Sequence, residues 1–312
     1  MAVRPQRLEE TLDRPALLSR LRSFLDREGV FAYLLLFPAL LVLLLFIAYP
    51  FVLGIWLSLT DKRAGLPGNF IGLDNFINDV KDPIFQRTVA NSFAYTLVTT
   101  IFKLGLGMGL ALLLSQTFRG KNVIRAIVLL PWIVPTVLST IAWQWMFDSS
   151  YSVFNWGLKN WFGWTGPLPN WLGDPFMAMV SVMTVNIWRG VPFFAISLLA
   201  GLQTVSLELY EAAAIDGANP WQRFWHITLP TIRPVLVIVM LFSVVWTLSD
   251  FQLVYVLTRG GPVNSTHLFA TYSFQTALGG GQIGLGASIS LFMFPVLAIV
   301  VLLIQRYLKK ES

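Results

Sequence analysis

The sequence has no cysteine, only two histidines and few charged residues. The lack of cysteine excludes a disulfide framework and a thiolate metal site. His226 and His267 are too far apart along the chain to form a histidine-rich metal site by themselves. Charged residues make up 12% of the 312 residues, whereas a soluble domain carries about twice that share. Because 55% of the residues are hydrophobic, the composition indicates an integral membrane protein.

Two sequence features of enzymes are also missing. The phosphate-binding motif G-x-x-x-x-G-K-[ST] does not occur, so nothing predicts ATP hydrolysis by this chain. The predicted membrane faces show neither an acidic cluster nor a Ser/His pair, so a lipid-modifying membrane enzyme has no support. The net charge is +6, but the basic residues are spread over loops at predicted membrane ends, which indicates topology rather than nucleic-acid binding.

Long apolar runs predict an all-α, polytopic membrane protein with six transmembrane helices. No charge occurs between Glu28 and Asp61, and roughly 20 apolar residues are enough to cross a bilayer. The predicted spans are 31–58, 92–116, 125–147, 176–201, 234–257 and 284–305. Lys and Arg are more numerous in the segments that would face the cytoplasm if both termini lie there. The N and C termini are therefore predicted to be cytoplasmic.

The same runs predict the organisation of the chain, with no separate soluble domain. Its parts are a cytoplasmic N-terminal segment (1–30), a first transmembrane helix (31–58), a periplasmic loop (59–91), a core with five transmembrane helices (92–306), which contains the loop 208–234, and a cytoplasmic tail (307–312). In the first segment, Leu17, Leu21, Phe24 and Leu25 fall on one helical face. Both an amphipathic helix at the membrane surface and a loose tail fit this pattern.

Glycine and proline predict details of three spans. Gly105 and Gly109 have the G-x-x-x-G spacing that permits close packing between membrane helices. Pro131 and Pro135 fall in the third span, and such prolines are tolerated where helices line a cavity. We expect Gly190, with the proline two residues later, to loosen the fourth span locally and expose backbone groups to a cavity.

The longest polar segment between the two apolar halves is the loop 208–234. Good helix formers at 211–214 predict a helix that ends at Asp216-Gly217. Asn219 is expected to cap a second short helix, with Pro220 at its first position. That helix would carry one apolar face, made by Trp221, Phe224 and Trp225. The loop is therefore predicted to be a short helix-turn-helix between two spans.

This loop resembles the EAA loop of binding-protein-dependent ABC importer permeases. The residues that carry the resemblance are Glu211, Ala212, Ala213, Asp216, Gly217, Ala218, Ile227, Leu229 and Pro230. In that family the loop is the coupling helix, which sits in a cleft on the ATPase subunit and transmits its motion. Residues 70–76 and 255–262 are similar to segments of sugar permeases of this family. The simpler alternative is a solvated connector that happens to be rich in alanine.

The resemblance implies a type I ABC importer permease fold in a bacterial or archaeal cytoplasmic (inner) membrane. Such a permease passes a carbohydrate from a periplasmic or extracellular binding protein into the cytoplasm. It implies a second homologous permease, as a heterodimer rather than a homodimer, and two separate ATPase subunits that bind ATP and Mg. No cofactor, catalytic residue or metal is expected in this chain. Mono-, di- and oligosaccharides, polyols and glycerol phosphates all remain open as cargo, with a neutral sugar favoured.

Three charged residues fall within predicted spans, where charge is costly and marks functional candidates: Lys103, Arg189 and Asp250. Lys103 either lies deep or reaches towards an interface, and a packing or orienting role is favoured. Arg189 and Asp250 either contact substrate, form a gate, or pair as a buried structural salt bridge. The alternative function is a secondary transporter or channel that uses these three residues for ion coupling.

One face of the fifth span combines polar and aromatic side chains, at Ser243, Trp246, Thr247 and Asp250. A ring can stack on the C–H face of a sugar, and the polar neighbours can bond its hydroxyls. The resemblance to maltose-type permeases implies sugar contacts here and in the fourth span, at Asn186, Arg189, Gly190 and Phe193, with Thr136 as a weaker match. Arg189 and Asp250 depart from that pattern, which has uncharged residues in their places.

Overall fold

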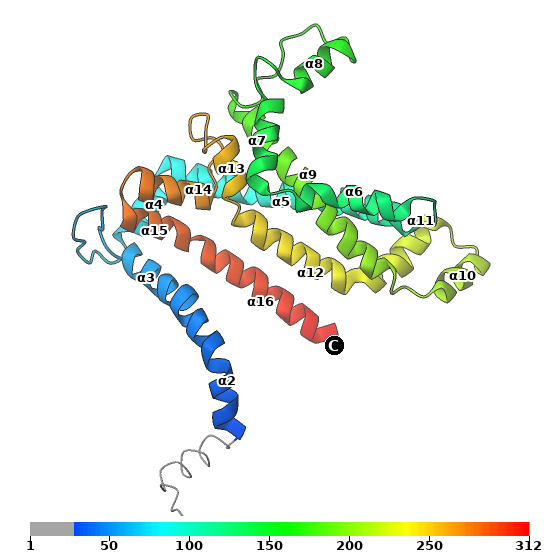
Figure 1. The fold of residues 1–312 in the computed structure, drawn as a ribbon, viewed down its shortest axis with the longest axis horizontal. Coiled ribbons are helices and arrows are strands. Elements are labelled where there is room, and N and C mark those ends of the chain that lie inside the picture. The colour runs from blue at the N-terminus through cyan, green and yellow to red at the C-terminus, as the bar shows by residue number, and fades with distance from the viewer. Residues whose placement is uncertain (1–27, 312) are drawn as a thin grey trace, which may run out of the picture. The chain divides into compact units, whose positions relative to one another are not determined.

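The computed structural model describes residues 28–311, which form helices joined by turns (Figure 1). The predicted surface helix around Leu17 and Leu25 lies outside the described residues. Within residues 28–311 the one β-pairing is an isolated bridge between Thr60 and Phe70. The chain divides into two compact units, Met1–Gly54 and Ile55–Ser312. In the first unit, α2 and the turn η1 form a continuous apolar helix that runs on into α3.

The described helices follow one another without a sheet between them. Their bounds are α2 (Glu28–Leu43), η1 (Leu44–Ala48), α3 (Tyr49–Ser58), α4 (Asp74–Lys81), α5 (Pro83–Ser115), α6 (Lys121–Ile133), α7 (Thr136–Met146), α8 (Val153–Asn160), α9 (Pro175–Leu202), α10 (Leu207–Ile215), α11 (Pro220–Arg223), η2 (Phe224–Thr228), α12 (Leu229–Leu248), α13 (Gln252–Leu257), α14 (Phe269–Phe274), η3 (Gln275–Gly279), α15 (Ile283–Leu291) and α16 (Met293–Glu311). The all-α prediction is therefore confirmed for the described part of the chain.

Among residues 28–311, five helical stretches are long and apolar enough to cross a membrane. They are Ala32–Ser58, Pro83–Ser115, Pro175–Leu202, Pro220–Leu248 and Ile283–Tyr307. A sixth is reached if α6 and α7, which are bent by 90° at their junction, count as one span. The third span is thus not the continuous helix that was predicted. The residue before a proline is biased away from helical geometry, and Val134, which precedes Pro135, is extended (ψ 131°).

The second half of the predicted loop 59–91 is largely helical. It contains α4, and α5 begins at Pro83, nine residues before the predicted start at 92. Asp82 caps α5 by accepting a hydrogen bond from the backbone N–H of Ile84 (2.9 Å), and Pro83 occupies the first turn. The helix is 33 residues long. It therefore exceeds the roughly 20 residues that a bilayer requires.

The fifth span also ends earlier than predicted. Helix α12 stops at Leu248, and α13 starts only at Gln252. The chain turns at Ser249, so Asp250 follows the helix instead of continuing its face. The predicted outside loop after this span likewise contains α14 and η3. Hydropathy alone does not predict either difference, because only a few residues separate one helix from the next.

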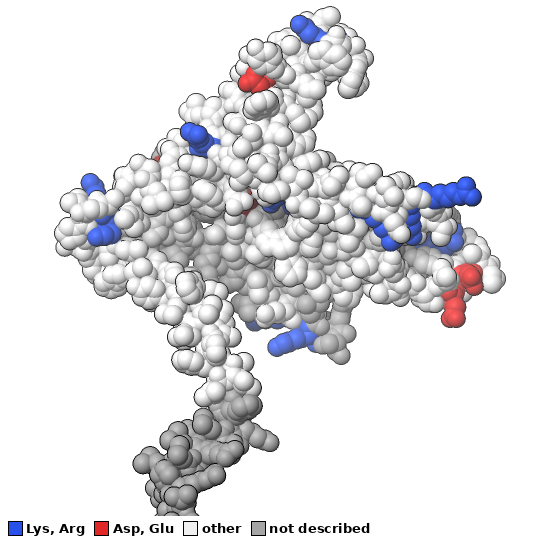
Figure 2. All heavy atoms as spheres, viewed as in Figure 1, with Lys and Arg blue, Asp and Glu red and all other residues white. Residues whose placement is uncertain are grey.

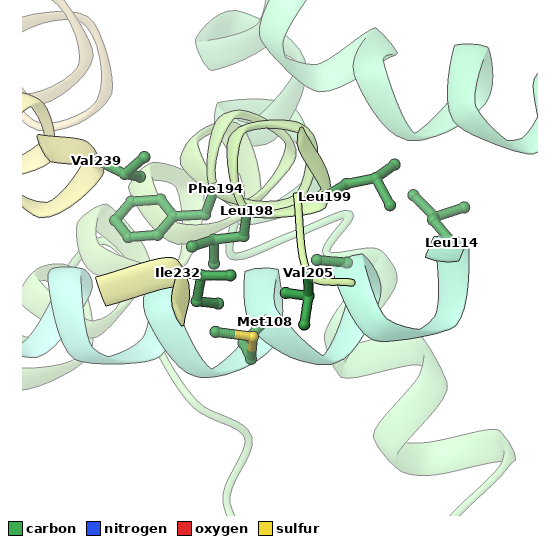
Figure 3. Close-up of a cluster of buried hydrophobic side chains, with 9 residues drawn as sticks. Met108, Leu114, Phe194, Leu198, Leu199, Val205, Ile232 and Val239 are labelled. Atoms are coloured by element: carbon green, nitrogen blue, oxygen red, sulfur yellow. The ribbon is translucent and has the colours of Figure 1, made fainter. Parts of the chain in front are cut away.

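The apolar core of the second unit joins α5, α9 and α12, which lie side by side (Figure 1). Figure 3 shows Met108 of α5, Phe194 and Leu198 of α9 and Ile232 of α12 pointing toward one another. The close approach between α5 and α9 occurs at Gly107, where an added Cβ would lie 2.4 Å from Cβ of Phe194. The G-x-x-x-G spacing at Gly105 and Gly109 is not used for close packing among the described residues, because nothing lies within 4 Å of a Cβ added at either position.

Charged side chains lie mainly at the ends of the helices. On the face shown in Figure 2, basic and acidic atoms gather where α6, α10 and α11 end, and the surface between the ends is largely uncharged. Many large hydrophobic side chains on α5 and α12 are exposed, such as Leu97 (63%), Ile101 (58%) and Phe242 (42%). Such a surface suits a lipid or protein environment rather than water.

Candidate functional site

A small, partly open cavity of about 30 Å³ lies among α5, α6, α9 and α12. It is lined by Lys103, Trp132, Asn186, Arg189, Gly190, Phe193, Phe194, Ser243, Trp246 and Thr247. The predicted contact residues of the fourth and fifth spans are therefore brought together here, except Asp250. Thr136 and Asp250 do not line the cavity, but each is hydrogen-bonded to a residue that does.

A buried polar network forms one wall of the cavity. Lys103 Nζ donates to Asn186 Oδ1 (2.9 Å) and to Thr247 Oγ1 (2.8 Å). Asn186 Nδ2 in turn donates to Asp250 Oδ2 (3.0 Å), which also accepts from the hydroxyl of Tyr95 (2.9 Å). The amide of Asn186 therefore stands between the ammonium group and the carboxylate. Since every member has a partner, the network avoids the cost of burying unpaired polar groups.

Three helices position this network. Lys103 comes from α5 and Asn186 from α9, while Thr247 lies in the last turn of α12. The end of α12 at Leu248 lets the chain turn so that Asp250 is buried (6% exposed) against the same group. One turn earlier, the hydroxyls of Thr100 and Ser243 are 3.2 Å apart and join α5 to α12. Lys103 is only 3% exposed, so it lies deep rather than reaching an interface.

Gly190 makes room for Lys103. A Cβ at this position would lie 2.3 Å from Cδ of Lys103. Helix α9 continues from Pro175 to Leu202 without a break, although Pro192 lies inside it. Gly190 and Pro192 therefore do not interrupt the fourth span. The glycine is required by the close passage of a lysine side chain from α5.

Arg189 and Asp250 do not pair. The guanidinium of Arg189 forms a short hydrogen bond to the hydroxyl of Thr136, at the start of α7. Asp250 is held by Tyr95 and Asn186, and no salt bridge between it and Arg189 occurs in the described part of the chain. The structural salt bridge that was one predicted alternative is thus contradicted. Arg189 is half-buried, and it lines the cavity.

Aromatic rings form a second wall. Trp132 stacks on Phe193 with ring centres 5.2 Å apart, and Trp246 contacts both rings, at 5.5 Å and 5.1 Å. Trp246 is 45% exposed. The lining of the cavity thus combines apolar ring faces with hydrogen-bond donors, which are the groups that a molecule with both C–H faces and hydroxyl groups requires.

Sequence reasoning missed three members of this site and undervalued a fourth. Trp132, Phe194 and Tyr95 were not predicted, and Lys103 was assigned a packing role. Tyr95, Thr99 and Lys103 recur at intervals of four on one face of α5, and this polar pattern is a signal that could have found Tyr95. Trp132 carries no comparable signal, because the bend between α6 and α7 decides where it points.

The helix ends in the loop 208–234 are where the sequence predicts them, but the second helix is not short, because it continues from Pro220 into the fifth span as one helical stretch, Pro220–Leu248. Helix α10 begins after Ser206, whose hydroxyl accepts from the N–H of Glu208, and ends before Gly217. Gly217 adopts a left-handed backbone (φ 80°), and Ala218 N–H bonds to the carbonyl of Ala213 (2.9 Å), which completes a Schellman cap. The predicted second cap is also confirmed, because Asn219 and Gln222 form a capping box in front of Pro220–Arg223.

The residues that resemble the coupling motif divide into two groups. Glu211, Ala212, Asp216 and Gly217 are exposed on α10 and the turn after it. Ile227 and Leu229 instead pack against the core formed by α5, α9 and α12. The hydroxyls of Tyr210 and Thr228 are 2.7 Å apart and tie α10 to η2. Ile215 is 88% exposed, so the outer face of α10 presents apolar as well as acidic groups.

In the part of the chain that the structure describes, no three His, Cys, Asp or Glu side chains come together as a possible metal site. His267 is buried (1% exposed), and burial lowers its pKa to about 4. His226 lies on η2, where its Nδ1 is 2.9 Å from the carbonyl oxygen of Gln222.

Comparison with known proteins identifies one matching family. The model of the family described as "Binding-protein-dependent transport system inner membrane component" matches residues 103–311. The chain is 37% identical over 270 residues to the trehalose/maltose transport system permease protein MalF of Thermococcus litoralis, covering 86% of this chain and 90% of the relative. It is 34% identical to the sulfoquinovosyl glycerol transport system permease protein SmoG of Agrobacterium fabrum, covering 95% and 96%.

A solved structure shares the fold. It is a crystal structure of a bacterial ABC transporter involved in the import of the acidic polysaccharide alginate, and one of its chains matches with a TM-score of 0.79. The match covers 93% of this chain and 99% of that chain at 23% identity. At this identity the likeness supports the fold alone.

Proposed function

Because the chain belongs to the family of binding-protein-dependent transport system inner membrane components, we propose that its buried cavity is the carbohydrate path of an ABC importer. The chain is a multi-pass inner-membrane permease and acts as a transport subunit. Its own part in import is to offer the solute a route between helices, with residues that bind it on the way.

The observation that carries the proposal is the pairing of two unlike walls in one cavity. The rings of Trp132, Phe193 and Trp246 would stack on the C–H faces of a sugar. The donors of Arg189 and Asn186 would bond its hydroxyl and ring oxygens. Permeases of trehalose/maltose and of sulfoquinovosyl glycerol are similar to this chain along most of its length, which supports a carbohydrate as the cargo.

The proposed partners would supply the functions that an importer needs besides this permease. We assign ATP and Mg to two separate ATPase subunits, and capture of the solute to a binding protein outside the membrane. A second, homologous permease would complete the cavity, which is partly open in this chain. The proposed topology keeps both termini and the loop 208–234 on the cytoplasmic side, where the ATPase is.

The loop is connected mechanically to the cavity. Helix α10 follows α9, which carries Asn186, Arg189 and Phe193. After α11, the helical stretch Pro220–Leu248 leads without interruption to Ser243, Trp246 and Thr247. We therefore assign the coupling role to the motif residues Glu211, Ala212, Ala213, Asp216, Gly217, Ala218 and Pro230, all exposed or partly exposed, with Ile227 and Leu229 as the anchor to the core. Closure of the ATPase dimer would move α10 and thereby tilt both helices that line the cavity.

The test is to purify the chain with its partners from native membranes and to measure ATPase activity with and without solute-loaded binding protein. Stimulation by the loaded binding protein is the expected result. Glu211→Arg should abolish stimulation by weakening ATPase docking, while membrane insertion is unchanged. Asp148→Arg makes the same charge change at an exposed position outside the loop, and should retain stimulation. A chain that purifies alone and moves solute without ATP would refute the proposal.

A further inference from the structure

The charges that line the cavity have one sign. Of the residues around it, Lys103 and Arg189 are charged, and both are cations. The acidic group nearest in the hydrogen-bond network, Asp250, does not line the cavity and is turned toward Tyr95 and Asn186. No acidic side chain among the described residues lines this space.

The two cations differ in how they are compensated. Lys103 bonds to Asn186 and Thr247, and Asn186 connects it to the carboxylate of Asp250. Among the described residues, Arg189 has one hydrogen-bond partner, the hydroxyl of Thr136, although a guanidinium offers five N–H donors. One positive charge therefore faces the cavity without a carboxylate against it.

We propose that the cavity selects carbohydrates by charge: it admits neutral and acidic sugars and rejects amino sugars, and Arg189 sets this preference. The proposal rests on the proposed function, in which this cavity is the carbohydrate path. A carboxylate, sulfonate or phosphate on the sugar would form a charge-assisted, bidentate pair with Arg189. The ammonium group of an amino sugar would instead meet the uncompensated Arg189 as a like charge in a site of reduced dielectric constant.

The lack of cysteine gives a test that needs no identified sugar, because an introduced cysteine is the one thiol of this chain. Trp246→Cys, at a position 45% exposed and lining the cavity, would report from inside. Thr165→Cys, at an exposed position in the segment after α8, is the matched control. Each variant, in the complex purified from native membranes, is reacted with 2-sulfonatoethyl methanethiosulfonate (anionic) and with 2-(trimethylammonium)ethyl methanethiosulfonate (cationic). Mass spectrometry of this chain gives both rates.

The anionic-to-cationic rate ratio at Trp246→Cys should exceed the ratio at Thr165→Cys by about tenfold or more, as expected for a nearby uncompensated charge. Adding Arg189→Gln should bring the ratio close to the control, while Arg189→Lys, which keeps the charge, should preserve it. Equal ratios at the two positions, or a ratio that Arg189→Gln leaves unchanged, would overturn the proposal. Failure of both reagents to react at Trp246→Cys in every nucleotide state would do the same.

Labelling depends on neither transport nor ATP, so the two proposals can fail separately. A charge bias in a complex that imports no carbohydrate would refute the proposed function and uphold the electrostatic part of this inference. An active importer that takes up an amino sugar as fast as its neutral parent would overturn the inference and uphold the proposed function.

Discussion

Lys103 and Asp250 carry opposite charges in one buried group, with the amide of Asn186 between them. Each charge is satisfied by neutral groups as well, through Thr247 for the lysine and Tyr95 for the aspartate. This arrangement compensates charge without a direct salt bridge. It also ties α5, α9 and the end of α12 together at the level of the cavity.

A double-mutant cycle tests whether the two charges depend on each other. Lys103→Met should lower the free energy of unfolding by about 3–5 kcal/mol, because it leaves the buried carboxylate of Asp250 without a compensating charge. Asp250→Asn should also lower the free energy of unfolding, because it leaves the buried ammonium group of Lys103 without a compensating charge. The double variant should lose clearly less than the sum of the two, as judged by thermal unfolding of the detergent-purified complex. Additive losses would show that the residues act independently.

A substitution at Gly190 tests the packing around Lys103. Gly190→Ala should displace Lys103, since the new Cβ would lie 2.3 Å from its Cδ, and should lower both the melting temperature and solute uptake. Gly105→Ala on α5 is the matched control, because nothing lies within 4 Å of its added methyl group. Replacing a helical glycine by alanine there should leave stability unchanged or raise it by about 0.5–1 kcal/mol. Equal effects of the two substitutions would contradict the steric role of Gly190.

The identity of the site residues could be predicted better than the contacts between them. Arg189 and Asp250 stand out in sequence because charge is rare in membrane spans, and both lie at the site. Their partners could not be predicted, because Thr136 and Asn186 reach them only through the relative register of different helices. The role of Lys103 was misjudged for the same reason.

At the level of elements, α4 carries a buried acid outside the spans. Asp79 is 2% exposed, and its carboxylate accepts a 2.6 Å hydrogen bond from Ser288 of α15. Burial raises the pKa of Asp79 from 3.8 to about 6; the bond from Ser288 lowers it in part, and the charge of Asp82 adds to the rise. The folded state therefore binds this proton more tightly than the unfolded chain does.

Because folding raises the pKa of Asp79, the free energy of unfolding should increase as the pH falls from about 7 through 6 towards 4. The contribution of Asp79 to stability is complete once the pH is below the pKa of this group in the unfolded chain, and it is lost as the pH rises through about 6. Thermal unfolding at pH 5 and pH 7 checks this, with Asp79→Asn as the reference, since the amide keeps the shape but does not titrate. If both proteins show the same change between the two pH values, α4 is not stabilised in this way.

Helix ends were predictable wherever the signal is local. Asn219 and Gly217 act on their own neighbours through caps, and both were predicted from sequence. The early start of α5 at Pro83 was not predicted because the polar residues before position 92, with their Gly, Pro and Asp, indicate a loop, although Asp82-Pro83 is itself a start signal. The 90° bend at Pro135 depends on how α7 packs against α13, so sequence gave no warning of its size.

For the whole molecule, the exposed loop and the buried cavity belong to one mechanical unit. The outer face of α10 is exposed, while Ile227 and Leu229 pack against the core that α5, α9 and α12 share. The cavity lies on the same helices. A push on the loop would therefore reach Trp246 through α12 rather than through flexible linkers.

The most direct measurement is carbohydrate uptake into proteoliposomes that contain the whole complex, with binding protein outside and ATP inside. Trp246→Ala should reduce uptake by about tenfold through loss of ring stacking, with assembly intact. Trp156→Ala, at an exposed tryptophan on α8 away from the cavity, should transport like the unaltered protein. Normal uptake by Trp246→Ala, or uptake that continues without ATP, would contradict the account of a carbohydrate path driven through the coupling loop.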